Sequence, residues 1–294
     1  MDFARILVQL DSDKQASVFD AVVAIDSGVD HLLQYANIEI SAVRGLVHGA
    51  MFTRGPADLK NTALFIGGSS VTQGEAILEE VQRAFFGPIR CSVMFDGNGA
   101  NTTASAAVLS AARHVDLSSA TCVVLGGTGP VGQRVARLLL SQGASVSLAS
   151  RELNKAQRAC ELLRKRATSE SAAKLQPLST DSPSDFEDAL ASASALFSCG
   201  AAGVRLVSSR QLETATKLRV AIDLNAVAPE GIEGVGIMDK GVERGARRDY
   251  GAIGVGGLKM KIHRESVRTL FTRNDLVLDA EEIFAIGQAL LQAK

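Results

Sequence analysis

A glycine-rich turn at residues 126–132 carries the clearest chemical signal in this sequence. Gly127, Gly129 and Gly132 form the pattern G-x-G-x-x-G. A short apolar run precedes the turn, and apolar residues at helical spacing follow it as far as Gly143. In such a unit the glycines allow a tight turn, a close approach of the backbone to a pyrophosphate, and close packing of helix on strand. The sequence therefore predicts a dinucleotide site formed by Gly127, Thr128, Gly129, Pro130, Val131 and Gly132.

The residues after the next expected strand, at 144–150, indicate which dinucleotide binds. Enzymes that use NAD usually place an acidic residue there, against the ribose hydroxyls. This chain has Ser150 and Arg151 there, and Lys155 follows one helical turn later. Hydroxyl, guanidinium and ammonium groups suit a 2′-phosphate, so we expect NADP. Glu152 leaves use of NAD open, and the alternative is that Arg151 and Lys155 form only a solvated helix start.

Two further strand ends belong to the same expected edge of the sheet. The small-residue loops at 200–203 and 225–231 would bring Ala201 and Asn225 close to the nicotinamide. The wall facing them would come from the strand ends of the preceding part of the chain, where small hydrogen-bonding residues are dense. Such a set suits a neutral heterocycle with many donors and acceptors, although the same residues are also typical helix caps. It comprises Asp96, Asn98, Asn101, Thr102 and Thr103.

No nucleophile and base can be paired from the sequence, and no histidine stands where a dehydrogenase would use one for proton transfer. The segment 251–264 has glycines at 251, 254, 256 and 257, a density that disfavours a helix. We therefore expect a loop there, which would bring Lys259 to the cleft. Lys261 is the competing basic residue.

Strand and helix patterns alternate along the whole chain and predict the α/β class. Strands at 5–10, 62–66 and 89–95, with helices between them, predict a small parallel N-terminal domain. The alternation from the glycine-rich turn onward predicts a doubly wound Rossmann-type domain. We expect a substrate domain at 1–103, a nucleotide domain at 104–278 and a cleft between them. The expected last helix, at 279–294, starts at the capping box Asp279-x-x-Glu282 and would pack back on the first domain.

Composition excludes several classes of protein. The chain has 294 residues, with 31 basic and 32 acidic residues mixed along it and a net charge of −1, so no nucleic-acid partner is expected. No apolar run reaches the roughly 18 residues of a membrane helix. The N-terminus does not read as a signal peptide, so we expect a cytoplasmic protein. The four cysteines are far apart and the histidines form no ligand pattern, so we expect no metal.

Several blocks together are more specific than the nucleotide motif. Through them the chain resembles the bacterial NAD(P)-dependent methylene-tetrahydromethanopterin dehydrogenases of methylotrophic one-carbon metabolism, over essentially its whole length. The blocks are VFDAVVAIDSGVDH (18–31), MFTRG (51–55), RAFFGPIR (83–90), DGNGANTTA (96–104), GGTGPVGQR (126–134), AIDLNAVAPEGIEG (221–234) and GAIGVGGLKMKIHR (251–264).

The resemblance implies transfer of a hydride from the methylene bridge of N5,N10-methylene-tetrahydromethanopterin to NADP or NAD, with methylene-tetrahydrofolate as an open alternative substrate. The methenyl cation that forms is delocalised over two nitrogens, so no proton need be removed. The resemblance also implies that Lys259 lies between pterin and nicotinamide, that Asp20 and the 98–103 set hold the pterin, and that the chain forms a homo-oligomer. The Y-x-x-x-K signature of the bifunctional folate dehydrogenase/cyclohydrolases is absent, so no cyclohydrolase activity is expected.

Two other functions fit parts of the sequence. A shikimate-dehydrogenase-like NADP oxidoreductase shares the order of domains, but it needs a Lys–Asp pair in the first domain that Lys14 and Asp20 match poorly. A non-catalytic NADP-binding sensor would bind the nucleotide without turnover.

Overall fold

The computed structural model describes residues 3–293, which divide into two compact units. The first unit joins the chain up to Thr102 to the segment from Met260 onward, and the second holds Thr103–Lys259. Both boundaries fall inside helices, α4 (Ala100–Ala111) and α10 (Ala252–Thr269). Residues 260–278 therefore lie in the first unit and not, as expected, in the second.

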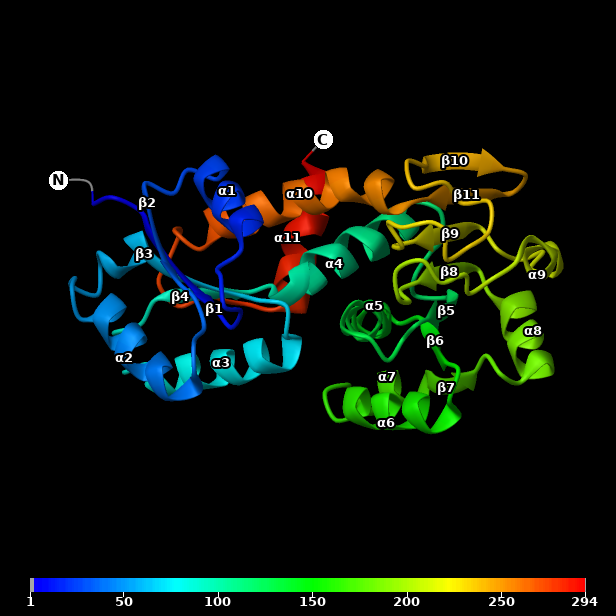
Figure 1. Ribbon diagram of the computed structural model, residues 1–294, viewed down its shortest axis with the longest axis horizontal. Coiled ribbons are helices and arrows are strands. Elements are labelled where there is room, and N and C mark those ends of the chain that lie inside the picture. Colours follow the sequence, from blue (N-terminus) through cyan, green and yellow to red (C-terminus); the bar gives the residue numbers. More distant parts are fainter. Residues whose placement is uncertain (1–2, 294) are drawn as a thin grey trace. The chain divides into compact units, whose positions relative to one another are not determined.

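The first unit contains a parallel sheet of five strands, in the order β12-β4-β3-β1-β2. Its helices α2 and α3 lie on one face of the sheet, and α1 lies on the other (Figure 1). The strands are β1 (Ile6–Asp11), β2 (His31–Tyr35), β3 (Thr62–Gly67), β4 (Ser92–Phe95) and β12 (Val277–Leu278). The helices are α1 (Val18–Asp26), α2 (Ile40–Met51), α3 (Val71–Ala84) and α11 (Ala280–Gln292), with short 3₁₀ turns at Leu59–Asn61 and Gly97–Gly99.

The central strands of this sheet are apolar because helices cover both of their faces. All six residues of β3 are buried, whereas β2 at the edge is mostly exposed. The sequence pattern predicts neither β2 nor β12, and it predicts that β4 begins at residue 89, where the chain still forms a turn. Edge strands lack the continuous apolar run by which buried strands are recognised.

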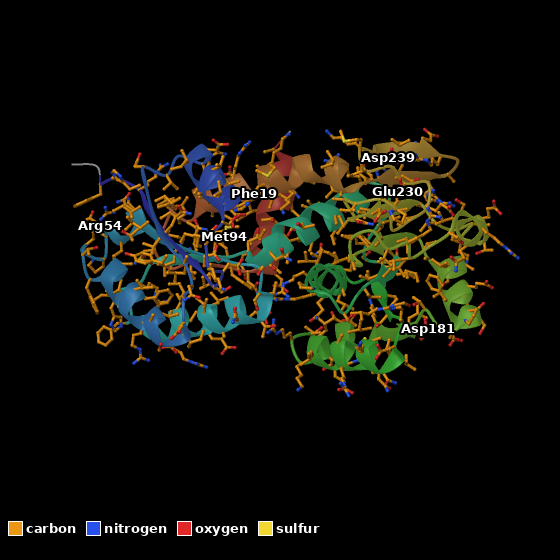
Figure 2. All side chains as sticks on the ribbon, viewed as in Figure 1. Phe19, Arg54, Met94, Asp181, Glu230 and Asp239 are labelled. Atoms are coloured by element: carbon orange, nitrogen blue, oxygen red, sulfur yellow. The ribbon has the colours of Figure 1, made fainter. Side chains whose placement is uncertain are left out.

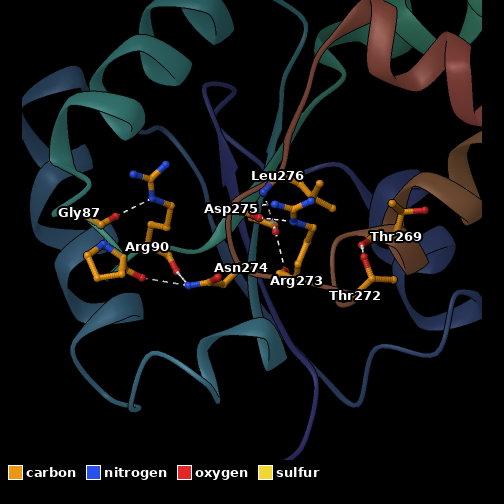
Figure 3. A network of polar contacts seen from close by, with 10 residues as sticks. Gly87, Arg90, Thr269, Thr272, Arg273, Asn274, Asp275 and Leu276 are labelled. Atoms are coloured by element: carbon orange, nitrogen blue, oxygen red, sulfur yellow. Dashed lines mark hydrogen bonds and ion pairs between the residues drawn. The ribbon is translucent and has the colours of Figure 1, made fainter.

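Polar contacts fasten the C-terminal segment to the first sheet (Figure 3). The Asn274 amide donates to the carbonyl oxygens of Pro88 at 3.0 Å and Arg90 at 3.2 Å. The Ser92 hydroxyl donates to the Arg273 carbonyl at 2.7 Å and accepts from the Leu276 N–H at 3.2 Å. These bonds align β12 beside β4. The capping box expected from Asp279 and Glu282 is confirmed at the start of α11.

The second unit contains a sheet of seven strands, in the order β10-β11-β9-β8-β5-β6-β7. Six of these strands are parallel and lie in the order β7-β6-β5-β8-β9-β11. This is the 3-2-1-4-5-6 order of a doubly wound sheet, so the expected fold class is confirmed. The strands are β5 (Thr121–Leu125), β6 (Ser145–Ser150), β7 (Leu175–Ser179), β8 (Ala195–Ser198), β9 (Val220–Asp223), β10 (Lys240–Arg244) and β11 (Arg247–Tyr250). The helices are α5 (Pro130–Ser141), α6 (Leu153–Arg164), α7 (Ser169–Ala173), α8 (Pro183–Ser192) and α9 (Ser209–Thr214).

The antiparallel hairpin of β10 and β11 was not anticipated, because its strands are strongly charged. Asp249 on β11 is fully buried, and its carboxylate accepts from Arg247 at 2.6 and 2.9 Å and from Arg244 at 3.0 Å. Arg244 also pairs at 2.7 Å with Asp239, which Figure 2 labels. This ionic network takes the place of the apolar pattern that marks other strands. Within residues 3–293, no helix combines the length and apolarity needed to cross a membrane.

Two helical glycines of the first unit give a matched test of its packing. A Cβ atom added to Gly74 of α3 would overlap the ring of Phe95, whereas one added to Gly45 of α2 has no atom within 4 Å. Gly74→Ala should lower the free energy of unfolding by about 1–3 kcal/mol, because overpacking outweighs the gain in helix propensity. Gly45→Ala should raise it by about 0.5–1 kcal/mol. Denaturant unfolding measures both, and equal effects would contradict this account of the core.

Candidate functional site

The glycine-rich turn of the second unit joins β5 to α5. Gly129 is the N-cap of α5, and Pro130 is its first residue. The Gly127 N–H donates to the Ala149 carbonyl at 3.0 Å, and the Gly129 N–H donates to the Gly126 carbonyl at 3.0 Å. These bonds hold the turn against β6 and leave the positive end of the α5 dipole at the edge of the sheet, where it favours a phosphate.

Close backbone contacts explain why these positions are glycines. Gly126 has φ +62°, and a Cβ atom there would lie 2.6 Å from the Cα and N of Gly200. A Cβ atom on Gly132 would lie 2.6 Å from the Gly126 oxygen, and one on Gly127 would lie 2.5 Å from Cγ of Leu148. The loops after β5 and β8 therefore touch backbone to backbone, where the strand order reverses and such sheets bind ligands. The sequence motif does not include Gly126 and Gly200. Each of them nevertheless begins a loop of small residues, Gly126 directly after β5 and Gly200 two residues after the end of β8.

The two basic residues expected at the 2′-phosphate, Arg151 and Lys155, have different surroundings in the structure. Ser150 is the last residue of β6, and Arg151 follows it with an exposed side chain. The Lys155 ammonium instead pairs at 2.6 Å with Glu152, and this hydrogen bond lowers the pKa of Glu152. Glu152 thus partly neutralises the charge of Lys155, whereas the Arg151 side chain is exposed.

The loops after β8 and β9 contain the other expected nucleotide residues. Ala201 is exposed in the first loop. Asn225 is buried, and its side-chain oxygen accepts from the N–H groups of Gly203 at 3.2 Å and Val227 at 3.0 Å. Its amide nitrogen donates to the Pro229 carbonyl at 2.8 Å. The Asn225 side chain therefore connects the two loops.

The first sheet has a reversal of strand order of its own, between β1 and β3. β1 ends at the buried Asp11, whose carboxylate accepts from the N–H groups of Asp13 at 2.9 Å and Ser17 at 3.0 Å. A Cβ atom on Gly67, the last residue of β3, would lie 3.4 Å from Oδ2 of both Asp11 and Asp20. Asp20 therefore lies at the edge of this sheet that the carboxyl ends of its strands form. The sequence points to Asp20 through the resemblance alone.

The polar set after β4 divides into two groups. Asp96 is buried, and its carboxylate accepts from the N–H groups of Asn101 at 2.9 Å and Thr102 at 3.1 Å and from the Thr102 hydroxyl at 2.6 Å. The Asn101 amide donates to the Phe95 carbonyl at 2.7 Å and to Asp279 at 3.0 Å. Asn101 and Thr102 thus fasten the start of α4, as in the capping alternative. Asn98 is exposed with φ +54°, and Thr103 is partly buried.

The expected loop around Lys259 is wrong, because residues 252–269 form helix α10. Glycine at 251 and 254 permits the start of this helix to lie directly on the backbone of residues 236–240, where any Cβ atom would collide. Tertiary packing therefore outweighs the low helix propensity of glycine. Lys259 is partly buried on α10, while Lys261 is exposed.

A histidine that the sequence pattern does not single out packs against β3 of the first sheet. His263, one helical turn after Lys259, is 1% exposed and stacks on Phe65 of β3, with ring centroids 5.7 Å apart and planes at 19°. The ring of Phe19, labelled in Figure 2, lies 6.3 Å from it. The i, i+4 spacing of Lys259 and His263 is the signal that would have associated them on one helix face.

A separate cavity of about 960 Å³ lies on the second unit, along β6, β7 and α8. Asp181, Asp185 and Asp188 line it, and no residue of the glycine-rich turn does. Three carboxylates against the single lysine of the lining, Lys174, disfavour a phosphate there. Among residues 3–293, no group of three His, Cys, Asp or Glu side chains is arranged to hold a metal ion.

Sequence comparison relates the chain to one enzyme family. A family model described as "Methylene-tetrahydromethanopterin dehydrogenase, N-terminal" matches residues 18–98. The "Bifunctional protein MdtA" of Methylorubrum extorquens is 39% identical over 290 residues, which cover 97% of this chain and 99% of that protein. The NAD(P)-dependent methylenetetrahydromethanopterin dehydrogenase of the same organism is 29% identical over 292 residues, covering 96% of this chain and 97% of that protein.

Structural comparison agrees with the two-unit fold. A shikimate dehydrogenase solved with NADP+ matches with a TM-score of 0.54 at 10% identity and covers 98% of this chain and 96% of that one. The 5-ketofructose reductase of a Gluconobacter species, in its ligand-free form, matches with a TM-score of 0.53 at 13% identity and covers 98% and 99%. At these identities the likeness concerns the fold alone.

The cysteines allow a test of how well the protein interior is shielded from solvent. All four are free thiols, and burial raises the pKa of Cys91 and Cys122 to about 12, that of Cys160 to about 11 and that of Cys199 further still. Because the thiolate is the reactive form, the folded protein at pH 8 should react with a thiol reagent far more slowly than the protein in denaturant, where all four should react. A fast-reacting thiol in the folded protein would contradict this burial.

Proposed function

This chain belongs to the methylene-tetrahydromethanopterin dehydrogenase family, and we propose that it oxidises the methylene bridge of N5,N10-methylene-tetrahydromethanopterin with NADP or NAD as the hydride acceptor. The near full-length relationship at 39% identity is the observation that carries the proposal. The two polar sheet edges support it, because a nucleotide and a pterin each need a site of their own. In this reaction the carbon–hydrogen bond of the bridge breaks, and the hydride leaves for the nicotinamide ring.

In this proposal the second unit binds the nucleotide. The turn from Gly127 to Gly132 admits the pyrophosphate without steric conflict, and the start of α5 stabilises its charge. Arg151 binds the 2′-phosphate, assisted by Ser150, which favours NADP. The pair of Lys155 with Glu152 adds little net charge there, so NAD remains a usable acceptor.

The first unit binds the pterin in this proposal. Asp20 and Asn98 lie at the edge of the sheet, and they offer acceptors and donors that suit the amino and amide groups of a pterin ring. Asn101 and Thr102 act through Asp96 by holding the turn that carries Asn98, and Thr103 continues that helix start. The substrate site is thus shaped by buried bonds and completed by a few accessible side chains.

The chemistry requires positioning more than proton transfer. Loss of the hydride leaves a cation shared by the two nitrogens beside the carbon, so no base has to remove a proton. We assign Lys259 an orienting role on the face of α10 that it shares with His263. Holding the donor carbon at close range to the acceptor can supply several kcal/mol of the barrier reduction.

We further propose that the protein is a cytoplasmic homo-oligomer. Its four free cysteines are typical of a reducing compartment. We propose no nucleic-acid partner, because the net charge is −1 and basic and acidic residues are mixed along the chain.

The reduction of nicotinamide, followed by absorbance, tests the function. Methylene-tetrahydromethanopterin and methylene-tetrahydrofolate should each be offered with NADP and with NAD. Turnover of the methanopterin substrate supports the proposal, and the ratio of rates gives both preferences. If neither substrate turns over while NADP binds, the dehydrogenase proposal fails and a nucleotide-binding sensor replaces it.

Arg151 provides a test of the nucleotide preference. Arg151→Ala should lower kcat/KM for NADP by about 10- to 100-fold, because a charge-assisted contact contributes about 1.5–3 kcal/mol. The value for NAD should change by less than about threefold, since NAD has no 2′-phosphate. Arg158→Ala, which alters an exposed residue of α6, the helix that follows Arg151, is the matched control. An equal loss with both nucleotides would refute the assignment of Arg151.

Lys259 provides a test of the catalytic site. Lys259→Gln should lower kcat with the pterin substrate by about 100-fold, because misplacement of the reacting groups is that costly. The dissociation constant of NADP should stay within about twofold. Lys261→Gln, on the exposed face of the same helix, should remain close to the unaltered enzyme. Full activity of Lys259→Gln would remove this residue from the site.

A further inference from the structure

The last residues of β8 and β9, Ser198 and Asp223, form a buried polar pair to which the proposed reaction gives no role. The two strands are parallel neighbours in the second sheet (Figure 1), and the two residues are register partners. Their exposed fractions are 0% and 1%. A Cβ atom on Gly231 would lie 2.2 Å from the Ser198 hydroxyl oxygen and 2.7 Å from Oδ1 of Asp223. The loop after β9 therefore returns to the strand ends, at a point where a side chain would not fit.

The Asp223 carboxylate holds both ends of this loop. Its Oδ1 atom accepts from the Asn225 N–H at 3.1 Å, and its Oδ2 atom accepts from the Ile232 N–H at 3.0 Å. Burying a carboxylate is costly unless donors surround it, so these two bonds restrict the loop strongly. One side chain therefore sets the positions at which residues 224–231 begin and end.

The loop after β9 in turn fixes the loop after β8. The Asn225 side-chain oxygen accepts from the Gly203 N–H at 3.2 Å, and the Gly231 carbonyl accepts from the Val207 N–H at 3.1 Å. Two loops that are bonded at two separate places have little freedom relative to each other. Asp223 therefore acts on the loop after β8 through its hold on the loop after β9.

The two loops present an apolar surface of small side chains. Every side chain that residues 201–204 and 226–229 expose is that of Ala, Val or Pro. Such a surface lets a flat aromatic ring approach closely, as in most sites for small ligands. In a doubly wound sheet these strand ends belong to the half that receives the nicotinamide. The loops that Asp223 holds therefore suit the nicotinamide end of the nucleotide.

We propose that Asp223 is a positioning residue for the nicotinamide, acting through the two loops that it holds. The proposal rests on the proposed function, because it concerns the same hydride acceptor. The carboxylate keeps the loop surface in a fixed place at the strand ends, so that the ring is held where the methylene bridge can deliver its hydride. The pyrophosphate and the 2′-phosphate bind at α5 and Arg151 in the proposed function, and they do not depend on Asp223.

Nucleotide binding tests this proposal without the reaction. The two ligands are NADP and 2′-phospho-ADP-ribose, which has the same phosphates but no nicotinamide. Asp223→Asn replaces one acceptor oxygen by an amide nitrogen, so one end of the loop is released. The dissociation constant of NADP should rise by about 3- to 10-fold, because binding must then order the loop. That of 2′-phospho-ADP-ribose should stay within about twofold, since its phosphates contact other elements. An equal rise for both ligands, or none for NADP, would overturn the proposal.

Turnover tests the same residue in the proposed reaction. Turnover counted per site that binds 2′-phospho-ADP-ribose excludes misfolded protein. It should fall by about 100-fold in Asp223→Asn, with little change in KM for the pterin, because the ring is misplaced while the pterin site is intact. Gly231→Ala should give the same result, since its Cβ atom would push the loop away from Ser198 and Asp223.

Asp249→Asn is the matched control, because it alters another buried carboxylate of the second unit, one that accepts from arginines of the β10–β11 hairpin. Its turnover per binding site should stay close to that of the unaltered chain. Normal turnover in both loop variants, or an equal loss in Asp249→Asn, would overturn the role of Asp223. An unaltered chain that binds NADP but oxidises no pterin would refute the proposed function instead, and the binding test would still decide the role of Asp223.

Discussion

The direct contact of two backbone loops at the switch point of the second sheet is the constraint on which the nucleotide site depends. A Cβ atom on Gly126 would collide with the backbone of Gly200, so the loop after β5 tolerates no side chain at this contact. This contact sets the distance between the ends of β5 and β8. With Gly132 pressed on Gly126, it also sets the entry of α5. The positive end of a helix is therefore held at the edge of the sheet without any specialised side chain.

In the first sheet, buried carboxylates fix the turns after the strands, as the glycine contacts do in the second sheet. Asp11 and Asp96 are buried at the ends of β1 and β4, and each accepts hydrogen bonds from N–H groups of the turn that follows it. Burying a carboxylate is costly unless donors surround it, so these turns have little freedom. Asp20 and Asn98 gain a defined position from neighbours that never need to touch a ligand.

The sequence predicted the elements with strong local patterns. The strand, turn and helix around residues 122–143 and the cap of α11 were anticipated because apolar periodicity, glycine and capping residues are local signals. Strands β2, β10 and β11 were not anticipated. The first is an exposed edge, and the other two depend on Asp249 and its arginines, which are brought together only by the hairpin. Helix α10 is predicted as a loop from the sequence because it is rich in glycine. The glycines at its start make room for the backbone of residues 236–240, and that contact forms only in the folded chain.

The sequence by itself determined the chemical inventory and the family: a glycine-rich turn, basic residues after β6, a set of small polar residues and a lysine among glycines. Tertiary structure alone decided how these groups are used. It paired Lys155 with Glu152 and left Arg151 exposed, buried Asn101 and Thr102 while exposing Asn98, and placed His263 against Phe65. The reason is physical. Propensity and periodicity act over one or two turns of chain, whereas burial and partner choice depend on residues that only folding brings into contact.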